Sequence, residues 1–350
     1  MKDPASALAA ATATDPSQLA GQLLALGTAF LWSISALSFE SASRRAGSIA
    51  VNLIRLVIAF VLLCAIGAAT RGRFLPTDAT AYQWKWLLIS GIVGFFIGDL
   101  CLFRALVILG ARVTTLIMSL APIIAAVTGY FWLGEQLTSW SFLGMMITLL
   151  GIVWVVSERA TGADEEEVVD PSGEIVGAPR SLALEPASPV LTQARNNSCD
   201  AGVAATGIVL ATLGAAGQGV GLVITKIGCA GAHRYDPFAT TQIRVIAGIA
   251  VFAIFILAMR RQRDVLAAVR NRWAMLFMSA GAITGPFLGV SMLNASIQRI
   301  PTGVAQTIGA LVPVLIIPFV VVLKKEHVSV RAILGALIAV AGVAVLMFSA

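Results

Sequence analysis

The chain contains ten separate runs of about 20 mostly apolar residues, and this repeated length constrains the fold more than any other feature. A run of that length can cross the hydrocarbon core of a bilayer as one helix. The runs are continuous and do not alternate, which favours helices over membrane strands. Most separators are short, so neighbouring spans must be antiparallel. The expected spans are 19–39, 48–68, 86–107, 111–133, 138–157, 203–227, 237–258, 273–297, 302–323 and 329–349.

The composition agrees with a membrane protein, because 58% of the residues are hydrophobic and only 12% are charged. A soluble domain has about 25% charged residues, so this chain has too few to cover a surface that faces water. The composition therefore excludes an ordinary cytosolic enzyme, and it excludes disorder for most of the chain. We expect an all-α, multi-pass integral protein of the inner or plasma membrane.

Two polar segments interrupt the apolar pattern. Residues 1–18 are rich in Ala and Thr, and we expect them to form a disordered tail. Residues 158–202 contain four prolines, and nine of the chain's 18 acidic residues lie within 158–200. We interpret 158–202 as an acidic disordered linker between two units, 19–157 and 203–350, of five spans each.

The two units repeat each other at a constant offset. A shift of 191 residues places Gly94, Phe96, Gly98, Pro122, Glu135, Gly144 and Gly151 on Gly285, Phe287, Gly289, Pro313, Glu326, Gly335 and Gly342. Five is an odd number, so the second unit must cross the membrane in the opposite sense to the first. Inverted repeats of this kind occur in many secondary transporters, with the binding site near the bilayer midplane.

The pattern of Pro, Glu and Gly residues in each unit resembles a known family. In the first unit, Pro122 is followed by Gly134-Glu135, by Leu137-Thr138 and by glycines 144 and 151. The second unit has Pro313, Glu326 and both later glycines, but Lys324-Lys325 replaces the Leu-Gly before the glutamate. Both resemble the EamA-type domain of the drug/metabolite transporter superfamily, and Arg55, Gly98-Asp99 and Ala105 are similar to a common subgroup.

The resemblance implies ten helices around a central cavity. It implies secondary-active export or exchange of small polar metabolites, such as amino acids, by alternating access. It also implies that the pathway is lined by the spans other than the second, fifth, seventh and tenth.

Four charged residues lie inside apolar runs, namely Arg55, Asp99, Arg104 and Arg244. Each charge costs at least about 2.5–3.5 kcal/mol in hydrocarbon unless it finds a partner, water or the headgroups. Arg55 and Asp99 lie at a similar depth on the same side, so we expect an ion pair. That pair is either structural or a proton-coupling site. Arg104 is close to the end of its span, where its side chain can reach the headgroups.

The second unit has no equivalent of this pair, because Val290 stands where the repeat would place a counterpart of Asp99. Two interpretations of Arg244 follow. It either captures an anionic group of the substrate or extends to the membrane surface.

Glu135, Glu326, Pro122 and Pro313 are interpreted as structural or hinge residues, together with Arg55. Each glutamate ends a span just before the next helix, whose positive N-terminal end favours a carboxylate. Thr138 is the expected N-cap of that helix in the first unit. Each proline removes a backbone hydrogen bond and permits a kink.

The candidate substrate-binding residues are polar or aromatic side chains within apolar spans, because uncharged polar groups in lipid seek partners or water. They are Trp32, Ser33, Asp99, Thr114, Thr115, Ser119, Gln218, Arg244, Asn294, Gln306 and Thr307.

The sequence shows no motif for a cofactor, a metal or ATP. The four cysteines form no CxxC pair, the two histidines are isolated, and there is no phosphate-binding GxxxxGK[ST] loop. We therefore expect no cofactor, no nucleic-acid partner and no enzyme activity. The expected partners are a small-molecule substrate, membrane lipid and a coupled proton or other ion. The sequence leaves open whether the chain forms a homodimer. The alternatives are a sugar-phosphate or nucleotide-sugar exchanger, a channel and a membrane-embedded enzyme.

Two arguments about orientation disagree. An inside N-terminus would leave seven basic residues in cytoplasmic segments, against 11 for an outside N-terminus without the linker. The positive-inside rule thus favours an outside N-terminus, whereas the family resemblance favours an inside one.

Overall fold

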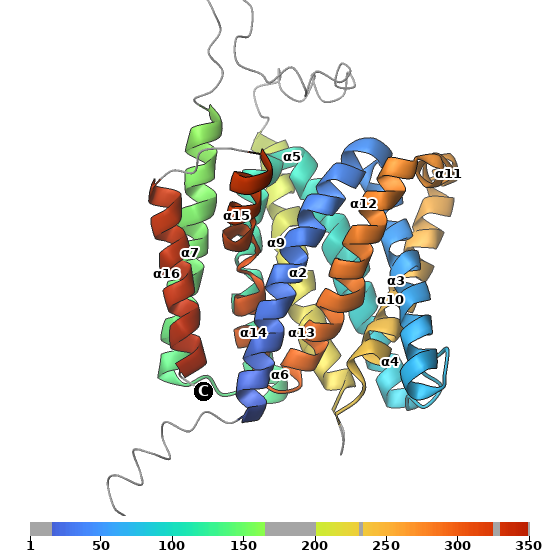
Figure 1. Cartoon of the computed structure of the whole chain (residues 1–350), viewed down its shortest axis with the longest axis horizontal. Coiled ribbons are helices and arrows are strands. Elements are labelled where there is room, and N and C mark those ends of the chain that lie inside the picture. The colour runs from blue at the N-terminus through green and yellow to red at the C-terminus, as the bar shows by residue number, and fades with distance from the viewer. Residues whose placement is uncertain (1–15, 165–200, 231–233, 325–329, 349–350) are drawn as a thin grey trace, which may run out of the picture.

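The computed structural model describes residues 16–164, 201–230, 234–324 and 330–348, which form an upright bundle of helices (Figure 1). Within these ranges nine helices are long and apolar enough to cross a membrane, and a shorter apolar stretch covers Thr302–Pro318. No strand occurs in the described part. The expected all-helical membrane fold is thereby confirmed. Residues 1–15 of the expected tail, residues 165–200 of the expected linker and Glu326 lie outside the described residues. The expectation of disorder is wrong for 16–18, 158–164 and 201–202, because these residues belong to the ends of α2, α7 and α9, whose bounds follow.

The helices follow the chain in two groups. The first group contains α2 (Pro16–Ala46), α3 (Ser48–Arg71), α4 (Ala81–Gly91), the π-helix η1 (Ile92–Gly98), α5 (Asp99–Met118), α6 (Ala121–Leu133) and α7 (Ser139–Asp164). The second contains α9 (Ala201–Gly228), α10 (Pro237–Ala258), α11 (Gln262–Arg270), α12 (Arg272–Ala282), the π-helix η3 (Ile283–Gly289), α13 (Val290–Ile297), α14 (Thr302–Gly309), α15 (Val312–Lys324) and α16 (Val330–Phe348).

The offset of 191 residues, found between matching residues of the two units, also separates the bounds of matching helices. It superimposes the bounds of α4 on α12, of η1 on η3 and of α6 on α15, and the first residue of α7 on that of α16. In Figure 1, α2 begins at the lower edge of the bundle and rises, whereas α9 begins at the upper edge and descends. The two groups thus start on opposite faces, as an inverted repeat requires.

The third and fourth spans are divided differently from the expectation. α5 continues from Asp99 to Met118 through the expected break at 108–110, and the helix ends instead at residues 119–120. Pro122 lies in the first turn of α6, where its missing N–H costs no hydrogen bond. Pro313 has the same place in α15, after a break at residues 310–311. The expected kinks are therefore complete breaks between two helices.

Spans three and eight each contain a π-helix that the sequence did not predict. One wider turn separates α4 from α5 at η1, and the equivalent turn separates α12 from α13 at η3. Glycines let other helices approach these turns closely. A Cβ on Gly217 of α9 would lie 2.8 Å from the Cα of Gly98, and one on Gly221 would lie 3.1 Å from the Cα of Gly94. Gly94 and Gly98 thus form a face on which α9 packs closely.

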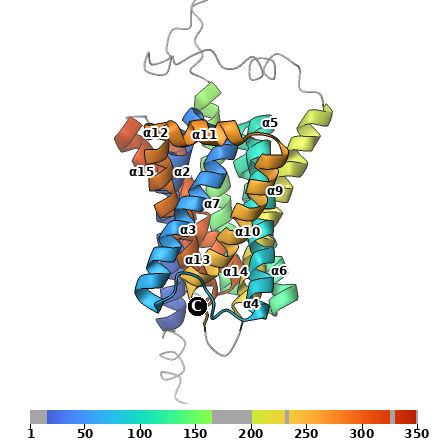
Figure 2. The ribbon, with the colours of Figure 1, turned by 90° about the vertical axis from the view of Figure 1, so that its right-hand side faces the viewer.

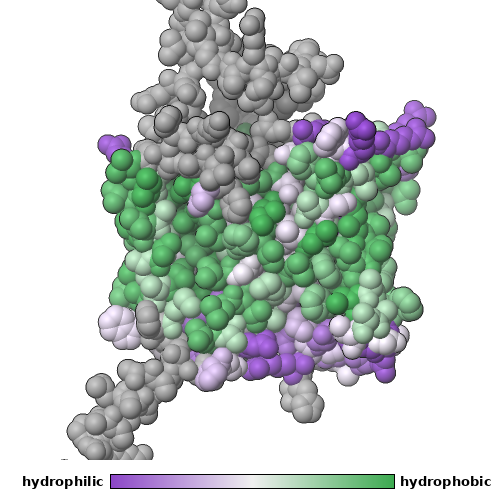
Figure 3. Space-filling model, in the orientation of Figure 1, coloured by the Kyte–Doolittle hydropathy of each residue, from purple (hydrophilic) through white to green (hydrophobic). Residues whose placement is uncertain are grey.

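The surface of the bundle is banded. Hydrophobic residues cover the middle of the face in Figure 3, and hydrophilic residues gather at its upper and lower edges. The short helix α11 lies across the upper end (Figure 2), between the expected spans 237–258 and 273–297. α7 and α16 pack against each other at one side of the bundle, and Gly144 closely approaches the backbone of Gly342 there. The other helices surround the space described next.

Candidate functional site

A cavity of about 440 Å³ lies between the two groups of helices. Its wall comes from both repeats and combines apolar, aromatic and charged side chains. From the first repeat it takes Trp32, Ser35, Ala36, Phe39, Arg55, Phe95, Asp99, Leu102, Met118, Ser119, Ala121, Pro122 and Ile152. From the second it takes Gln218, Leu222, Arg244, Gly285, Pro286, Val290, Leu293, Gln306, Gly309, Ala310, Val312 and Pro313.

Asp99 is the carboxylate of this wall. It follows η1 directly and begins α5, and it forms the expected ion pair with Arg55 of α3. Its other oxygen accepts a hydrogen bond of 2.9 Å from the side-chain amide of Gln218 in α9. The close approach of Gly217 to Gly98 explains why Gln218 can reach Asp99. The pair thus joins two helices of the first repeat to one of the second.

Arg244 is the second cation of the wall, and it does not extend to the membrane surface. Only 5% of the residue is exposed, which excludes the interpretation that its side chain reaches the headgroups. One terminal nitrogen donates a hydrogen bond of 3.1 Å to the side-chain oxygen of Asn294. The guanidinium carbon lies 5.0 Å from the ring centre of Phe95. The buried Nε has no hydrogen-bond partner among the described residues.

A polar network holds Asn294 in place. Its amide nitrogen donates to the hydroxyl of Thr241 at 3.0 Å, and Thr241 and Ser291 share a hydrogen bond of 2.9 Å. The network connects α10 with α13 and is buried. It therefore fixes the oxygen that receives Arg244, and through it the orientation of the guanidinium.

The cavity is closed toward the lower face of Figure 1. Leu222 and Leu293 line the cavity, and because α9 and α13 descend, Lys226 and Ile297 lie about one turn below them. Ile297 is fully buried in the apolar cluster that continues there. In the other direction the wall reaches up α2 as far as Phe39.

Glu135 strengthens this lower closure. One carboxylate oxygen pairs with the Nζ of Lys226 at 2.6 Å. The other accepts hydrogen bonds from the backbone N–H and the hydroxyl of Thr302, at 2.8 and 2.7 Å. Gly134, with φ of 65°, ends α6 in the left-handed conformation and turns the chain back toward Thr302. Glu135 thus caps α14 of the other repeat, a contact that the expectation for the next helix, α7, did not include. Thr138 caps α7 as expected, accepting from the N–H of Ser141 at 3.1 Å.

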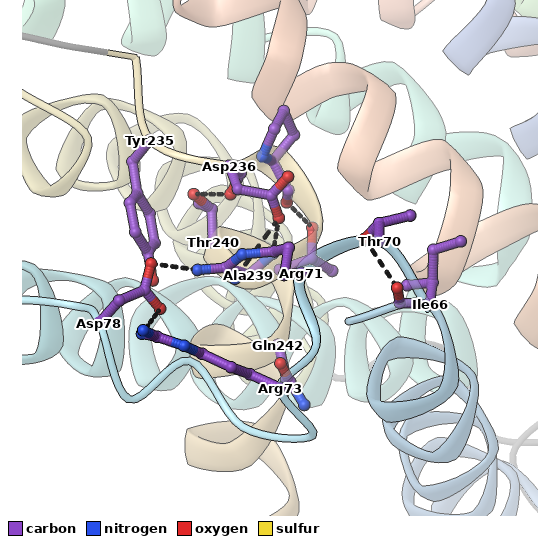
Figure 4. Close-up of polar contacts among 12 residues, drawn as sticks. Ile66, Thr70, Arg71, Arg73, Asp78, Tyr235, Asp236, Ala239, Thr240 and Gln242 are labelled. Carbon is purple, nitrogen blue, oxygen red and sulfur yellow. Dashed lines mark hydrogen bonds and ion pairs between the residues drawn. The ribbon is translucent and has the colours of Figure 1, made fainter. Parts of the chain in front are cut away.

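A second polar cluster joins the repeats at the lower face (Figure 4). Arg71, at the end of α3, pairs with Asp78 and lies 3.8 Å from a carboxylate oxygen of Asp236. Its guanidinium carbon is 5.7 Å from the ring centre of Tyr235. Burial raises the pKa of Tyr235 above its usual value. Gln242 donates to the backbone carbonyl of Phe74 at 2.7 Å, which ties the same loop to α10.

Six of the candidate binding residues line the cavity, namely Trp32, Asp99, Ser119, Gln218, Arg244 and Gln306. Asn294 contacts Arg244 from behind the wall. Ser33, Thr114 and Thr307 are buried outside the wall, and the hydroxyls of Ser33 and Thr307 donate to carbonyls of their own helices. The side chain of Thr115 and all of Glu326 lie outside the described part. Arg55, Pro122 and Pro313, expected to be structural, line the cavity.

The expectation that spans two, five and seven stay out of the pathway is wrong for the wall of this cavity. Arg55 and Arg244 belong to spans two and seven, and their length lets them reach past neighbouring side chains into the cavity. Ile152 comes from span five. The sequence reasoning also missed Phe39 and Phe95, over whose rings the two arginines lie. Arginine–aromatic contacts of this kind have no spacing signal, since the partners lie on different helices.

Among the described residues no group of three or more metal-ligating side chains comes together.

Comparison with known proteins identifies the repeats. The model of the EamA-like transporter family matches residues 19–157 and again residues 205–348. Among solved structures, one crystal structure has a TM-score of 0.64 and 18% sequence identity, and the alignment covers 93% of this chain and 95% of that chain. At this identity the likeness concerns the fold alone. No curated protein matches the chain significantly.

Proposed function

Because the chain belongs to the EamA-like transporter family of the drug/metabolite transporter superfamily, we propose that it carries small polar metabolites by secondary-active, alternating-access transport. The family consists of membrane transporters and not of enzymes, and this chain is a multi-pass membrane transporter. Export or exchange of compounds such as amino acids across the inner or plasma membrane is the function that we propose within this class.

The cavity is the observation that supports the proposal. It lies inside the bundle, both repeats build it, and it is closed toward one face by Glu135, Lys226 and Thr302. A carrier needs a site that opens to one side at a time, and inverted repeats supply two equivalent closures. The polar and aromatic wall suits a small polar solute, with a few placed polar groups in an apolar enclosure.

The driving force is proposed to be an ion gradient or solute exchange, since the sequence has no phosphate-binding loop for ATP. The Arg55–Asp99 pair is the candidate coupling site. Protonation of Asp99 would break the ion pair and release Arg55. An anionic solute or ion could then bind to Arg55 in the place of Asp99. A sugar-phosphate or nucleotide-sugar exchanger is the second candidate function, and the buried Arg244 is the observation that favours it.

Counterflow in proteoliposomes tests the proposal. The full chain is reconstituted, the vesicles are loaded with an unlabelled amino acid or sugar phosphate, and uptake of the labelled compound is followed without a gradient. A carrier gives transient accumulation that saturates with concentration. A flux that does not saturate and shows no counterflow would indicate a channel and contradict alternating access.

A further inference from the structure

The charges of the cavity wall do not balance. Three charged residues line it, two arginines and one aspartate. Arg55 forms an ion pair with Asp99, so the wall carries one excess positive charge at Arg244. Among the described residues Arg244 forms no ion pair, although only 5% of it is exposed. An unpaired guanidinium away from water is costly, and a ligand that supplies the missing negative charge removes that cost.

The repeat shows where the missing carboxylate would be. Arg55 is the eighth residue of α3 and Arg244 is the eighth residue of α10, so the two arginines occupy corresponding places in the second helices of the repeats. Val290 is the counterpart of Asp99 at the offset of 191. Val290 lines the cavity, as Asp99 does, and it begins α13 directly after η3, as Asp99 begins α5 after η1. The second repeat therefore keeps the arginine and the geometry but lacks the acid.

Arg244 is held ready for an anion. Asn294 receives one end of the guanidinium, and the ring of Phe95 lies beside it. Gly94 leaves room for the other end, because a Cβ there would lie 3.2 Å from a terminal nitrogen of Arg244. Nε stays without a hydrogen-bond partner among the described residues. A fixed planar guanidinium with free donors is suited to an oxyanion such as a carboxylate or a phosphate.

We propose that Arg244 is the anion subsite of the cavity, and that the transported metabolites carry an oxyanion which takes the place of the carboxylate that Val290 lacks. The inference rests on the proposed function, since it names the substrate class of the same cavity. The uncharged and cationic relatives of such metabolites lack the group that neutralises Arg244, so they bind less well.

Matched ligand pairs test the subsite by thermal stabilisation of the purified full chain. The pairs are lactate with lactamide, alanine with alaninamide, and glycerol 3-phosphate with glycerol. We expect the acid of at least one pair to stabilise the protein with at least tenfold higher apparent affinity than its partner. The first two pairs report on carboxylates and the third on phosphates. Equal stabilisation within every pair, or no stabilisation by any of the acids, would overturn the proposal.

Substitutions connect the effect to Arg244. Arg244→Gln should weaken acid binding at least tenfold and leave the amide or alcohol unchanged, whereas Arg244→Lys should retain part of the affinity. Arg104→Gln is the matched control, because Arg104 is exposed on α5 and does not line the cavity. It should change neither member of a pair. Acid binding that survives Arg244→Gln would contradict the assignment.

Val290→Asp is the sharpest variant, because it supplies the missing acid. It should abolish the preference for acids while keeping the thermal stability of the unliganded protein at least at the wild-type value. In the Arg244→Gln background the same substitution should lower that stability, since the new carboxylate then has no partner. An undiminished preference for acids in Val290→Asp would show that the anion binds elsewhere.

Two readouts separate this inference from the proposed function. Acid-selective binding without counterflow would leave the subsite standing and refute transport by alternating access. Counterflow of acids and their uncharged relatives at equal rates would leave transport standing and refute the subsite.

Discussion

At the scale of single residues, Glu135 joins three segments that are distant in the sequence. Its carboxylate contacts Lys226 at the end of α9 and caps α14 at Thr302. The side chains of Glu135 and Lys226 are 10% and 24% exposed, so water screens the pair only in part. Such a carboxylate contributes through charge-assisted hydrogen bonds as well as through the ion pair.

Glu135→Gln should lower the free energy of unfolding by about 1.5–3 kcal/mol, because the bonds to Lys226 and to the N-terminus of α14 lose their charge. Thermal unfolding of the purified protein measures the effect. Asp264→Asn is the control, since the Arg261–Asp264 pair is 47% and 48% exposed and should contribute about 0.2–1 kcal/mol. Equal losses in the two variants would mean that the lower closure does not depend on this carboxylate.

The Arg55–Asp99 pair should show strong energetic coupling. Asp99→Asn and Arg55→Gln each leave a buried partner unsatisfied, so each is destabilising alone, whereas the double variant removes both charges. We expect the loss in the double variant to be smaller than the sum by about 0.5–3 kcal/mol. A double-mutant cycle on unfolding free energies measures this coupling. Additive losses would contradict a direct interaction.

The sequence predicted some of these contacts and not others, for physical reasons. The pairing of Arg55 with Asp99 followed from their equal depth, because a buried charge needs a partner at its own level. The depth of Arg244 in its span did not decide whether the side chain faces a substrate or extends to the membrane surface. A long arginine side chain at that depth can do either. The contact of Glu135 with Thr302 spans 167 residues and both repeats, and no local pattern specifies it.

At the scale of helices, glycines decide how closely spans three and seven approach each other. Two glycines of span three face Arg244, but they face different parts of it. A Cβ on Gly91 would overlap the backbone of Arg244, and one on Gly94 would only press on its guanidinium. The first contact sets the distance between helices, and the second sets the place of a side chain.

Gly91→Ala and Gly94→Ala should therefore have different effects. The first should destabilise the protein by about 1–3 kcal/mol, since α4 and α10 must separate. The second should leave stability nearly unchanged and weaken binding of acids, because the guanidinium is displaced. Unfolding and ligand titration of both variants measure this.

Gly309→Ala is the stability control for both variants. A Cβ at this position would meet only Trp32, at 4.0 Å, although Gly309 also lines the cavity. It should leave stability unchanged. Similar stability losses in Gly91→Ala and Gly94→Ala would contradict the separation of roles.

The helices themselves were predictable because the need to bond every backbone group in lipid leaves few alternatives to a helix. The places where these helices are interrupted were less predictable from the sequence. A π-turn such as η1 or η3 has the same apolar composition as the α-helix around it, and hydropathy does not distinguish them. The helix α11 was also missed, because its nine residues are too short and too basic for a span.

At the scale of the whole molecule, the structure represents one end state of the proposed cycle. The cavity is closed toward the lower face, where the N-terminal end of α2 lies (Figure 1). A single cysteine on the wall reports which face is open. Ala310, between α14 and α15, is suitable because it lines the cavity.

Ala310→Cys in a background without the four native cysteines should react with a membrane-impermeant maleimide from one side of oriented vesicles. Addition of Glu135→Gln should raise the labelling rate from the opposite side, since the lower closure is weakened. Asp264→Asn should not change it. Equal labelling from both sides without Glu135→Gln would indicate a continuous pore.

The π-turns have a consequence for every residue that follows them. One extra residue in a turn rotates the rest of a helix by about 100° relative to regular α-helical winding. Asp99 stands immediately after η1 and Val290 immediately after η3. Without the additional residue, the direction of each side chain would swing away by more than a quarter of a circle. The extra residue in each π-turn thus determines whether Asp99 of span three and Val290 of span eight face the solute.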